Sequence, residues 1–286
     1  MIGFIGLGVM GEAMCRNLGR KASEDVLGFD LDPAPLARLK DEGVDAAGSV
    51  REIAEHCNVV FLSLPGVLEV KNVCVGPSSL LLHMHPASYV VDLSTTTVAL
   101  AQDLHSRFAA RGIQFADAPV ARTRAAAAEG TLSVMVGATE PVFKRLKPTL
   151  DLIGTDITHC GAPGAGQAMK LINNMVLFQN VVAIAEALSL ARKAGLSATR
   201  VFDALSKGSA DSFALRNHGM KAMLPDKFPE LAYSVEYALK DMEYLMEFAR
   251  QAHAELSGAK NAIAALERAA AAGNGKQYFP VLAKTV

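Results

Sequence analysis

Apolar residues over the first 160 positions fall into short runs, separated by longer segments in which they recur with helical spacing. The runs predict strands over residues 2–5, 25–29, 58–64, 88–92, 113–117 and 132–136. Residues 12–20 read as a helix between the first two strands. Strands that alternate with helices in this way predict a doubly wound parallel sheet.

A second pattern begins after the glycine-rich segment 161–166, where the strand runs stop. Residues 167–194 predict one long helix that is apolar around its whole circumference, as expected for the buried spine of a helical domain. We therefore expect an α/β domain over residues 1–160 and an all-helical domain over 161–286 that serves substrate binding and oligomerisation. A helical domain that is this apolar predicts a homodimer or a homotetramer.

Three glycines follow the first strand directly, with the spacing Gly6-x-Gly8-x-x-Gly11. In a Rossmann domain the first glycine permits the tight turn, the second lets the backbone approach a pyrophosphate, and the third lets the helix pack on the strand. Asp30 stands at the end of the second strand, where a carboxylate binds the ribose hydroxyls of NAD and repels the extra phosphate of NADP. NAD is the expected cofactor, although Asp30 could instead serve only the turn at 30–33.

Some use of NADP stays open, because Leu31 and Arg38 leave the phosphate region incompletely specified. The chain carries 28 basic and 29 acidic residues, and a net charge of -1 gives no reason to expect a nucleic acid or an anionic membrane as partner. Its four cysteines are scattered and read as small buried apolar residues in a reducing compartment. With no export signal and no long uninterrupted apolar run, a cytoplasmic location is expected.

Candidate chemistry lies in the segment from Gly164 to Asn174, where Lys170 and Asn174 are one helical turn apart on one face. A lysine that is partly withdrawn from water near a helix N-terminus releases its proton readily. Lys170 could therefore protonate a substrate oxygen as hydride arrives at carbon, while Asn174 holds the substrate or the lysine in line. Taken alone the pair is a weak signal, because most helix lysines lie at the solvated surface.

With these residues in place, the chain resembles the 3-hydroxyisobutyrate dehydrogenase family, also called the β-hydroxyacid dehydrogenases, almost from end to end. The resemblance rests on motifs in a fixed order: Gly3 to Gly11, Leu64-Pro65, Asp92-Leu-Ser-Thr95, Asp117-Ala-Pro-Val120 with Gly130-Thr-Leu132, Gly164 to Asn174, and Lys240-Asp241.

The family resemblance implies a role for individual positions. Lys170 matches the catalytic lysine and Asn174 the asparagine of the substrate site. Lys240 would lie near the cofactor, with Asp241 bracing it. The remaining positions are implied as contacts of the cofactor phosphates (Val9, Met10), of the adenosine (Leu64, Pro65), and of the nicotinamide and substrate (Ser94, Thr95).

One loop departs from the family pattern. The family usually has Ser-Gly-Gly after Asp-Ala-Pro-Val, whereas this chain has Ala121-Arg122-Thr123-Arg124. An arginine pairs well with a carboxylate or a sulfonate, so this substrate loop suggests a strongly anionic substrate, unless the arginines face water or an acidic neighbour. Arg122-Thr123 and Asn173-Asn174 are similar to the sulfolactaldehyde reductase branch, but Leu177 replaces the hydroxyl residue of that branch.

The leading hypothesis is an NAD-dependent enzyme that interconverts a small anionic aldehyde acid and its hydroxy acid, without a metal. The substrate alternatives are the aldehydes methylmalonate semialdehyde, tartronate semialdehyde, succinic semialdehyde and sulfolactaldehyde. Imine reduction is a second hypothesis. The presence of Lys170 disfavours it, because imine-reducing relatives generally use another proton donor. A third hypothesis is that the chain is a non-catalytic binding protein with the same fold.

Overall fold

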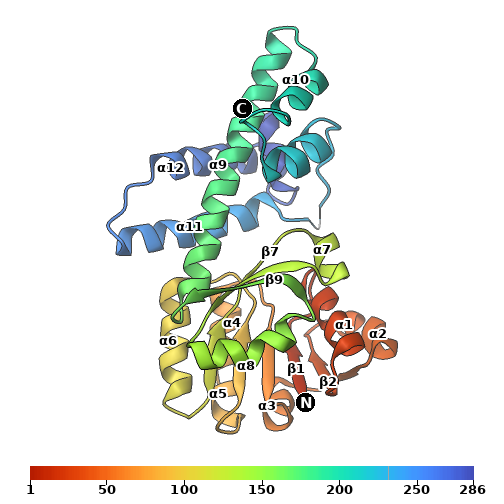
Figure 1. The fold of residues 1–286 in the computed structure, drawn as a ribbon, viewed down its shortest axis with the longest axis vertical. Helices are drawn as coiled ribbons and strands as arrows, with labels where there is room; N and C mark the ends of the chain where they lie inside the picture. Colours follow the sequence, from red (N-terminus) through yellow and green to blue (C-terminus); the bar gives the residue numbers. More distant parts are fainter. Residues whose placement is uncertain (231) are drawn as a thin grey trace. The chain divides into compact units, whose positions relative to one another are not determined.

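A computed structural model describes residues 1–230 and 232–286 of the chain (Figure 1). The chain divides into two compact units, Met1–Lys170 and Leu171–Val286, which we call the sheet unit and the helical unit.

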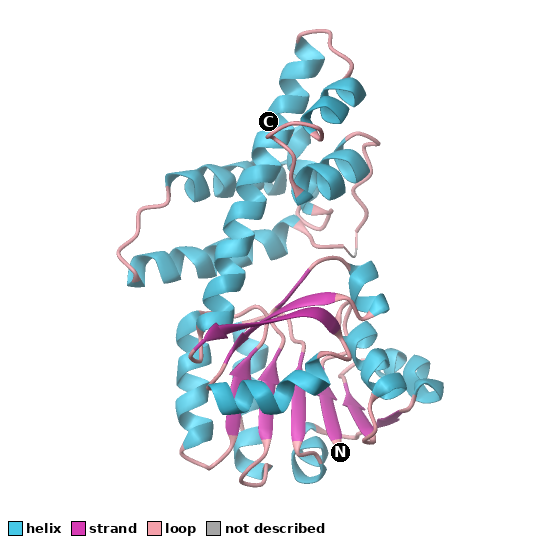
Figure 2. Ribbon diagram, in the orientation of Figure 1, coloured by secondary structure: helices cyan, strands magenta, loops and turns pink. Residues whose placement is uncertain are grey.

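The sheet unit is built on a mostly parallel sheet, drawn in magenta in Figure 2. Its strand order is β3-β2-β1-β4-β5-β6-β8-β7, with β9 paired to β8. The first six positions reproduce the order of a dinucleotide-binding fold, whose topological switch point lies between β1 and β4. The strands are β1 (Ile2–Ile5), β2 (Val26–Phe29), β3 (Val44–Ala46), β4 (Val59–Leu62), β5 (Tyr89–Asp92), β6 (Gln114–Asp117), β7 (Val120–Ala121), β8 (Leu132–Gly137) and β9 (Gly154–Gly161).

The predicted fold class is confirmed, with two differences in detail. Strands β3, β7 and β9 were not expected from the sequence. They are short or largely exposed, so they lack the apolar runs that mark the central strands. The sheet is also not wholly parallel, because β8 runs antiparallel to β6 and β7.

Both faces of the central strands are buried, which explains their nearly continuous apolar sequence. Phe4 and Phe61 stack on one face with 6.2 Å between ring centroids. Ile5, Val60 and Leu62 belong to the core on the other face. The helical elements of this unit are α1 (Gly11–Lys21), α2 (Pro33–Leu39), η1 (Lys40–Glu42), α3 (Val50–His56), α4 (Val67–Val75), α5 (Leu80–His83), α6 (Val98–Ala109), α7 (Arg124–Glu129) and α8 (Glu140–Leu150).

The helical unit contains no strand among its described residues. The long helix α9 (Ala165–Lys193) begins in the sheet unit and matches the predicted helix to within two residues at each end. The other helical elements are α10 (Ala198–Leu205), η2 (Leu215–Met223), α11 (Val235–Gln251), α12 (Ser257–Ala269), η3 (Ala270–Asn274) and η4 (Phe279–Lys284).

The sequence suggested that helix α9 is buried on all sides, but the structure shows that one side is exposed. Leu171, Phe178 and Val181 are fully buried, whereas Met169, Ile172 and Val176 are exposed on the single chain. By length and hydropathy alone α9 would also fit across a membrane; 44% of its most apolar window is buried in the fold, and a soluble core helix meets the same criterion. Cys160 likewise departs from the expectation of buried cysteines, because it is only partly buried.

Candidate active site

The glycine turn after β1 joins three glycines with different steric demands. Gly6 has φ +93°, and a Cβ on it would lie 2.3 Å from the carbonyl oxygen of Ser63. A Cβ on Gly11 would lie 2.0 Å from the carbonyl oxygen of Gly6. A Cβ on Gly8 would meet nothing within 4 Å, so protein packing does not require glycine there. Space above Gly8 is what the approach of a pyrophosphate needs, and the turn therefore fits a dinucleotide.

Val9 and Met10 complete this turn. Val9 is 48% exposed, and Met10 precedes the first residue of α1. The first N–H groups of a helix have no partner within the helix and bind anions well. Contacts of Val9 and Met10 to the cofactor phosphates stay a prediction of the family resemblance.

Asp30 follows β2 and contacts the same turn. One carboxylate oxygen, Oδ2, accepts a hydrogen bond from the Leu7 amide at 2.5 Å, and Oδ1 accepts one from the Asp32 amide at 2.9 Å. Asp30 therefore serves the turn at 30–33 and also places a carboxylate beside the glycine turn. Arg38 is held by a salt bridge to Glu12 at 2.7 Å.

Two further predicted segments meet at the carboxyl ends of β4 and β5. The Leu64 amide donates to Ser94 Oγ at 2.9 Å, and the Ser94 amide donates to Asp92 Oδ1 at 3.0 Å. The Ser94 hydroxyl thus joins the loop after β4 to the loop after β5. Ser94 is almost fully buried, Thr95 beside it is partly buried, and Pro65 is exposed. The sheet unit thus brings Leu64 and Ser94 together at one edge, next to the switch point.

A buried clamp that sequence reasoning missed fixes the start of α9. Asp117, at the end of β6, accepts hydrogen bonds from the amides of Gly164 at 2.7 Å and Gln167 at 2.8 Å. The Gln167 side chain accepts from the Thr96 amide at 3.0 Å and donates to the Ser94 carbonyl at 2.8 Å. Lys170 lies one turn after this clamp and is 8% exposed. A clamped first turn holds a buried lysine in a defined place.

Burial raises the pKa of Asp117 to about 6, although the amide hydrogen bonds from Gly164 and Gln167 pull in the opposite direction. In the sequence Asp117 stands out only as the first residue of a family motif. Its spacing from Gln167, fifty residues along the chain, carries no local signal that could have revealed the clamp.

The substrate loop is held by its own contacts. Arg122 has φ +89°, a conformation that suits the glycine found there in the family. Its guanidinium donates to the Thr131 carbonyl at 2.6 Å and to Thr155 Oγ1 at 3.1 Å, and pairs with Asp156 at 2.6 Å. The pair is solvent-exposed, so it contributes little to stability.

The neighbours of Arg122 have simple roles in the fold. Thr123 caps α7, its hydroxyl accepting from the Ala126 amide at 3.3 Å. Ala121 ends β7. The structure therefore gives Arg122 and Thr123 structural contacts and leaves a role in anion binding as a prediction.

In the helical unit the predicted residues Asn174 and Lys240 share one partner. Asn174 Nδ2 donates to Asp241 Oδ2 at 2.8 Å, and Lys240 Nζ lies 3.2 Å from Asp241 Oδ1. Asn173 Nδ2 donates to Asn174 Oδ1 at 3.2 Å. Sequence reasoning missed Tyr233, whose hydroxyl donates to the same carboxylate oxygen.

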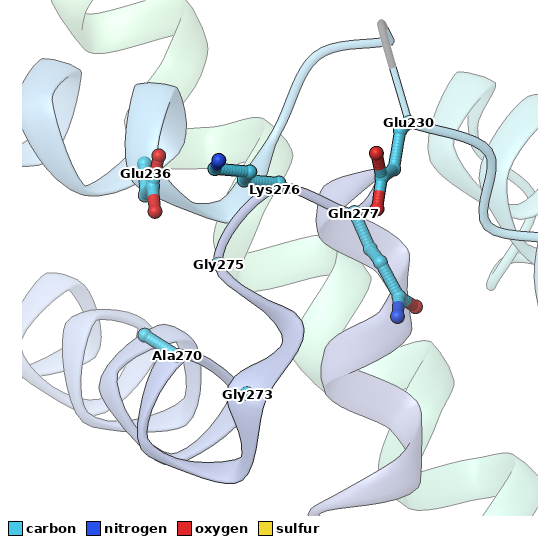
Figure 3. Close-up of a pocket in the computed structure, with 7 residues that line it drawn as sticks. All are labelled: Glu230, Glu236, Ala270, Gly273, Gly275, Lys276 and Gln277. Atoms are coloured by element: carbon cyan, nitrogen blue, oxygen red, sulfur yellow. The ribbon is translucent and has the colours of Figure 1, made fainter.

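A separate pocket of about 310 Å³ lies in the helical unit (Figure 3). None of the predicted site residues lines it, and two of its three ionisable side chains are carboxylates, which do not suit an anionic acid. Its lining residues are Glu230, Glu236, Ala270, Gly273, Gly275, Lys276 and Gln277. This pocket is therefore not a candidate for the substrate site.

Comparison with known families agrees with these features. Residues 1–161 match the NAD-binding domain of 6-phosphogluconate dehydrogenase, and residues 164–285 match the NAD-binding domain of NADP-dependent 3-hydroxyisobutyrate dehydrogenase. The fold and the glycine turn define an NAD(P)-dependent oxidoreductase. The chain belongs to the 3-hydroxyisobutyrate dehydrogenase family of β-hydroxyacid dehydrogenases.

Individual relatives extend over nearly the whole chain. It is 33% identical to 2-(hydroxymethyl)glutarate dehydrogenase of Eubacterium barkeri, over 99% of this chain and 93% of that protein. It is 32% identical to 2-hydroxy-3-oxopropionate reductase of Escherichia coli, over 87% and 84% of the two chains. The structure of Mycobacterium tuberculosis 3-hydroxyisobutyrate dehydrogenase with L-serine is 32% identical and has a TM-score of 0.89, over 99% and 98% of the chains. Small hydroxy acids are thus the substrate class of the family.

Proposed function

We propose that this protein interconverts a small aldehyde acid and its hydroxy acid with NAD(H), and that Lys170 is the proton donor to the substrate oxygen. The observation that carries the proposal is the buried Lys170, set one turn after the Asp117–Gln167 clamp on a helix of a β-hydroxyacid dehydrogenase. A buried ammonium held in a fixed place suits proton transfer better than a solvated one.

In this proposal the cofactor supplies the hydride, and the residues of the chain supply binding and the proton. Lys170 gives its proton to the carbonyl oxygen during reduction and takes the hydroxyl proton back during oxidation. Asn174, four residues further along α9, holds the substrate or the lysine in line. An alternative role in imine reduction is disfavoured, because it would leave Lys170 without this task.

NAD is the proposed cofactor in preference to NADP. Asp30 supports this choice, because its carboxylate lies against the glycine turn and would repel a 2′-phosphate. Arg38, the nearby cation considered for that phosphate, already pairs with Glu12.

A carboxylate substrate is proposed ahead of a sulfonate. The Arg122 guanidinium has Asp156 as a partner, and Thr123 is engaged as a helix cap, so both groups have a role without a sulfonate. The sulfolactaldehyde alternative requires Arg122 to leave Asp156 for the substrate.

We also propose a homo-oligomer, in which a second copy covers the exposed apolar residues Met169, Ile172 and Val176 of α9. Light scattering on the purified protein checks this, since the mass of a single chain would contradict it.

The experiment that tests the proposed function is NADH oxidation by the purified protein with methylmalonate semialdehyde, tartronate semialdehyde, succinic semialdehyde and sulfolactaldehyde. Wild type is compared with Lys170→Ala and with Lys193→Ala, a control lysine exposed in the last turn of the same helix. Lys170→Ala should lower kcat by about 10²- to 10⁴-fold and keep NADH binding, whereas the control should retain activity. Equal activity of Lys170→Ala and wild type would refute the role of the lysine.

Arg122→Gly belongs in the same assay, since glycine keeps the φ of +89° that serine would strain. A loss of activity confined to sulfolactaldehyde would identify Arg122 as a sulfonate contact and favour that branch. Unchanged rates on a carboxylate substrate would make Arg122 an anchor of the loop.

A further inference from the structure

Three side chains of the helical unit meet around one carboxylate. Asn174 comes from α9, Asp241 from α11, and Tyr233 from the segment just before α11. Asp241 Oδ2 accepts from Asn174 Nδ2 at 2.8 Å and from the Tyr233 hydroxyl. Asn174 Nδ2 also lies 3.2 Å from the Tyr233 oxygen. Asn174 and Asp241 are 1% and 3% exposed, so water is largely excluded from these contacts.

The chemistry of these groups fixes which way the Asn174 amide faces. An ionised carboxylate can only accept hydrogen bonds, so the amide nitrogen must face Asp241. The second N–H of that nitrogen is directed at the Tyr233 oxygen. The amide carbonyl therefore faces away, where it accepts from Asn173 Nδ2 at 3.2 Å and keeps a second lone pair.

Tyr233 is suited to this task because its hydroxyl is donor and acceptor at once. It donates its single proton to Asp241 and accepts from Asn174, so it orients both neighbours. Burial, with the Asp241 carboxylate beside it, raises the pKa of Tyr233 well above its ordinary value, and the hydroxyl stays protonated. A phenylalanine would leave one buried Asn174 N–H without its acceptor.

The Tyr233 ring and backbone are held in place independently of this hydroxyl. The ring packs against Phe178, one turn after Asn174 on α9, with centroids 5.9 Å apart, and against Phe279 at 5.4 Å. The Tyr233 carbonyl accepts from the Phe279 amide at 2.9 Å. Removing only the oxygen should thus leave the ring where it is.

We propose that Tyr233 is a positioning residue, which together with Asp241 holds the Asn174 amide so that it acts on a ligand as a hydrogen-bond acceptor. This inference rests on the proposed function for its consequence in catalysis. An accepting carbonyl suits a hydroxyl of the hydroxy acid or the Lys170 ammonium, and it does not suit the acid group of the substrate, which must be bound by donors elsewhere.

The test compares Tyr233→Phe with Tyr278→Phe. Tyr278 is the control, because its hydroxyl likewise bonds to a polar side chain of this unit, His218 at 2.5 Å, and stands outside the proposed machinery. Tyr233→Phe should lower kcat about tenfold and leave the Kd of NADH unchanged, since a misdirected amide affects the reacting oxygen more than the cofactor. Tyr278→Phe should keep the wild-type kcat.

A double-substitution cycle separates positioning from general damage. In an Asn174→Ala background the amide is gone, so Tyr233→Phe should produce no further loss of kcat. Equal losses in the wild-type and Asn174→Ala backgrounds, or a loss of the same size from Tyr278→Phe, would overturn the inference.

A readout without turnover keeps the two proposals apart. In protein labelled with ¹⁵N-asparagine, the Asn174 side-chain amide, assigned by its absence in Asn174→Ala, should exchange its protons faster in Tyr233→Phe than in wild type or Tyr278→Phe. Faster exchange in a protein that turns over none of the acids would support positioning and refute the function. Normal turnover with unchanged exchange would refute positioning alone.

Discussion

In the sheet unit the glycine turn and Asp30 are held by backbone groups, whereas in the helical unit Asn174 is held by other side chains. The glycine turn depends on a φ of +93° and close backbone contacts, and Asp30 binds two amides. Asn174 depends on Asp241 and Tyr233. A site made of backbone leaves a glycine signature that is readable along the chain. A site made of side chains does not, because its members come from distant segments.

The largest effect is expected when two glycines of the glycine turn, Gly11 and Gly8, are each replaced by alanine in separate variants. Gly11→Ala places a methyl 2.0 Å from a carbonyl oxygen, so it should destabilise the fold by about 3 kcal/mol or more. Gly8→Ala meets nothing within 4 Å, so it should leave the free energy of unfolding unchanged and weaken NADH binding. Denaturant unfolding and NADH titration measure both. Unaltered NADH affinity in Gly8→Ala would contradict a cofactor role for this glycine.

Next in size is a pH effect of opposite sign in the two units. Burial raises the pKa of Asp117 in the sheet unit from 3.8 to about 6, and burial lowers that of His218 in the helical unit from 6.5 to about 4. The stability due to Asp117 is therefore full below about pH 4 and is lost as pH rises through 6. The stability due to His218 is full above pH 6.5 and is lost as pH falls through 4. Each shift corresponds to about 3 kcal/mol.

Because the two contributions oppose each other, single substitutions should unmask them. Asp117→Asn leaves the His218 effect, so its free energy of unfolding should rise between pH 4 and 6.5 relative to wild type. His218→Gln leaves only the Asp117 effect, so the free energy of unfolding of this variant should fall between pH 4 and 6 relative to wild type. Urea unfolding across this range measures the slopes, and one common slope for all three proteins would refute the prediction.

The smallest effect is expected for Asp30→Ala. Without the carboxylate beside the glycine turn, the repulsion of a 2′-phosphate is removed, so the ratio of kcat/KM for NADPH to that for NADH should rise about tenfold. Arg38 keeps its pair with Glu12 and adds no new phosphate contact of its own. A preference that does not move would show that Asp30 serves the turn alone.

Much of the fold was predictable, for reasons visible in particular elements. Strands β1 and β4 are apolar on both faces, and α9 keeps helical spacing of its apolar residues over a long segment. Their local sequences therefore allow few alternatives. Strand β9 is largely exposed and polar, and it forms because β8 offers it a partner. The exposure of Ile172 and Val176 was also missed, because a helix that is apolar all round does not reveal which side its own chain covers.

The sequence by itself determined the dinucleotide turn, the order of an α/β and a helical domain, and the pair Lys170 and Asn174 on one helix face. These features are local, set by glycine conformation, apolar period and helical spacing. Only the tertiary structure decided that Asp117 and Gln167 clamp the start of α9, that Arg122 pairs with Asp156, and that Tyr233 reaches Asp241. Such contacts join residues far apart in sequence, and burial gives them their strength, so they arise only once the chain has folded.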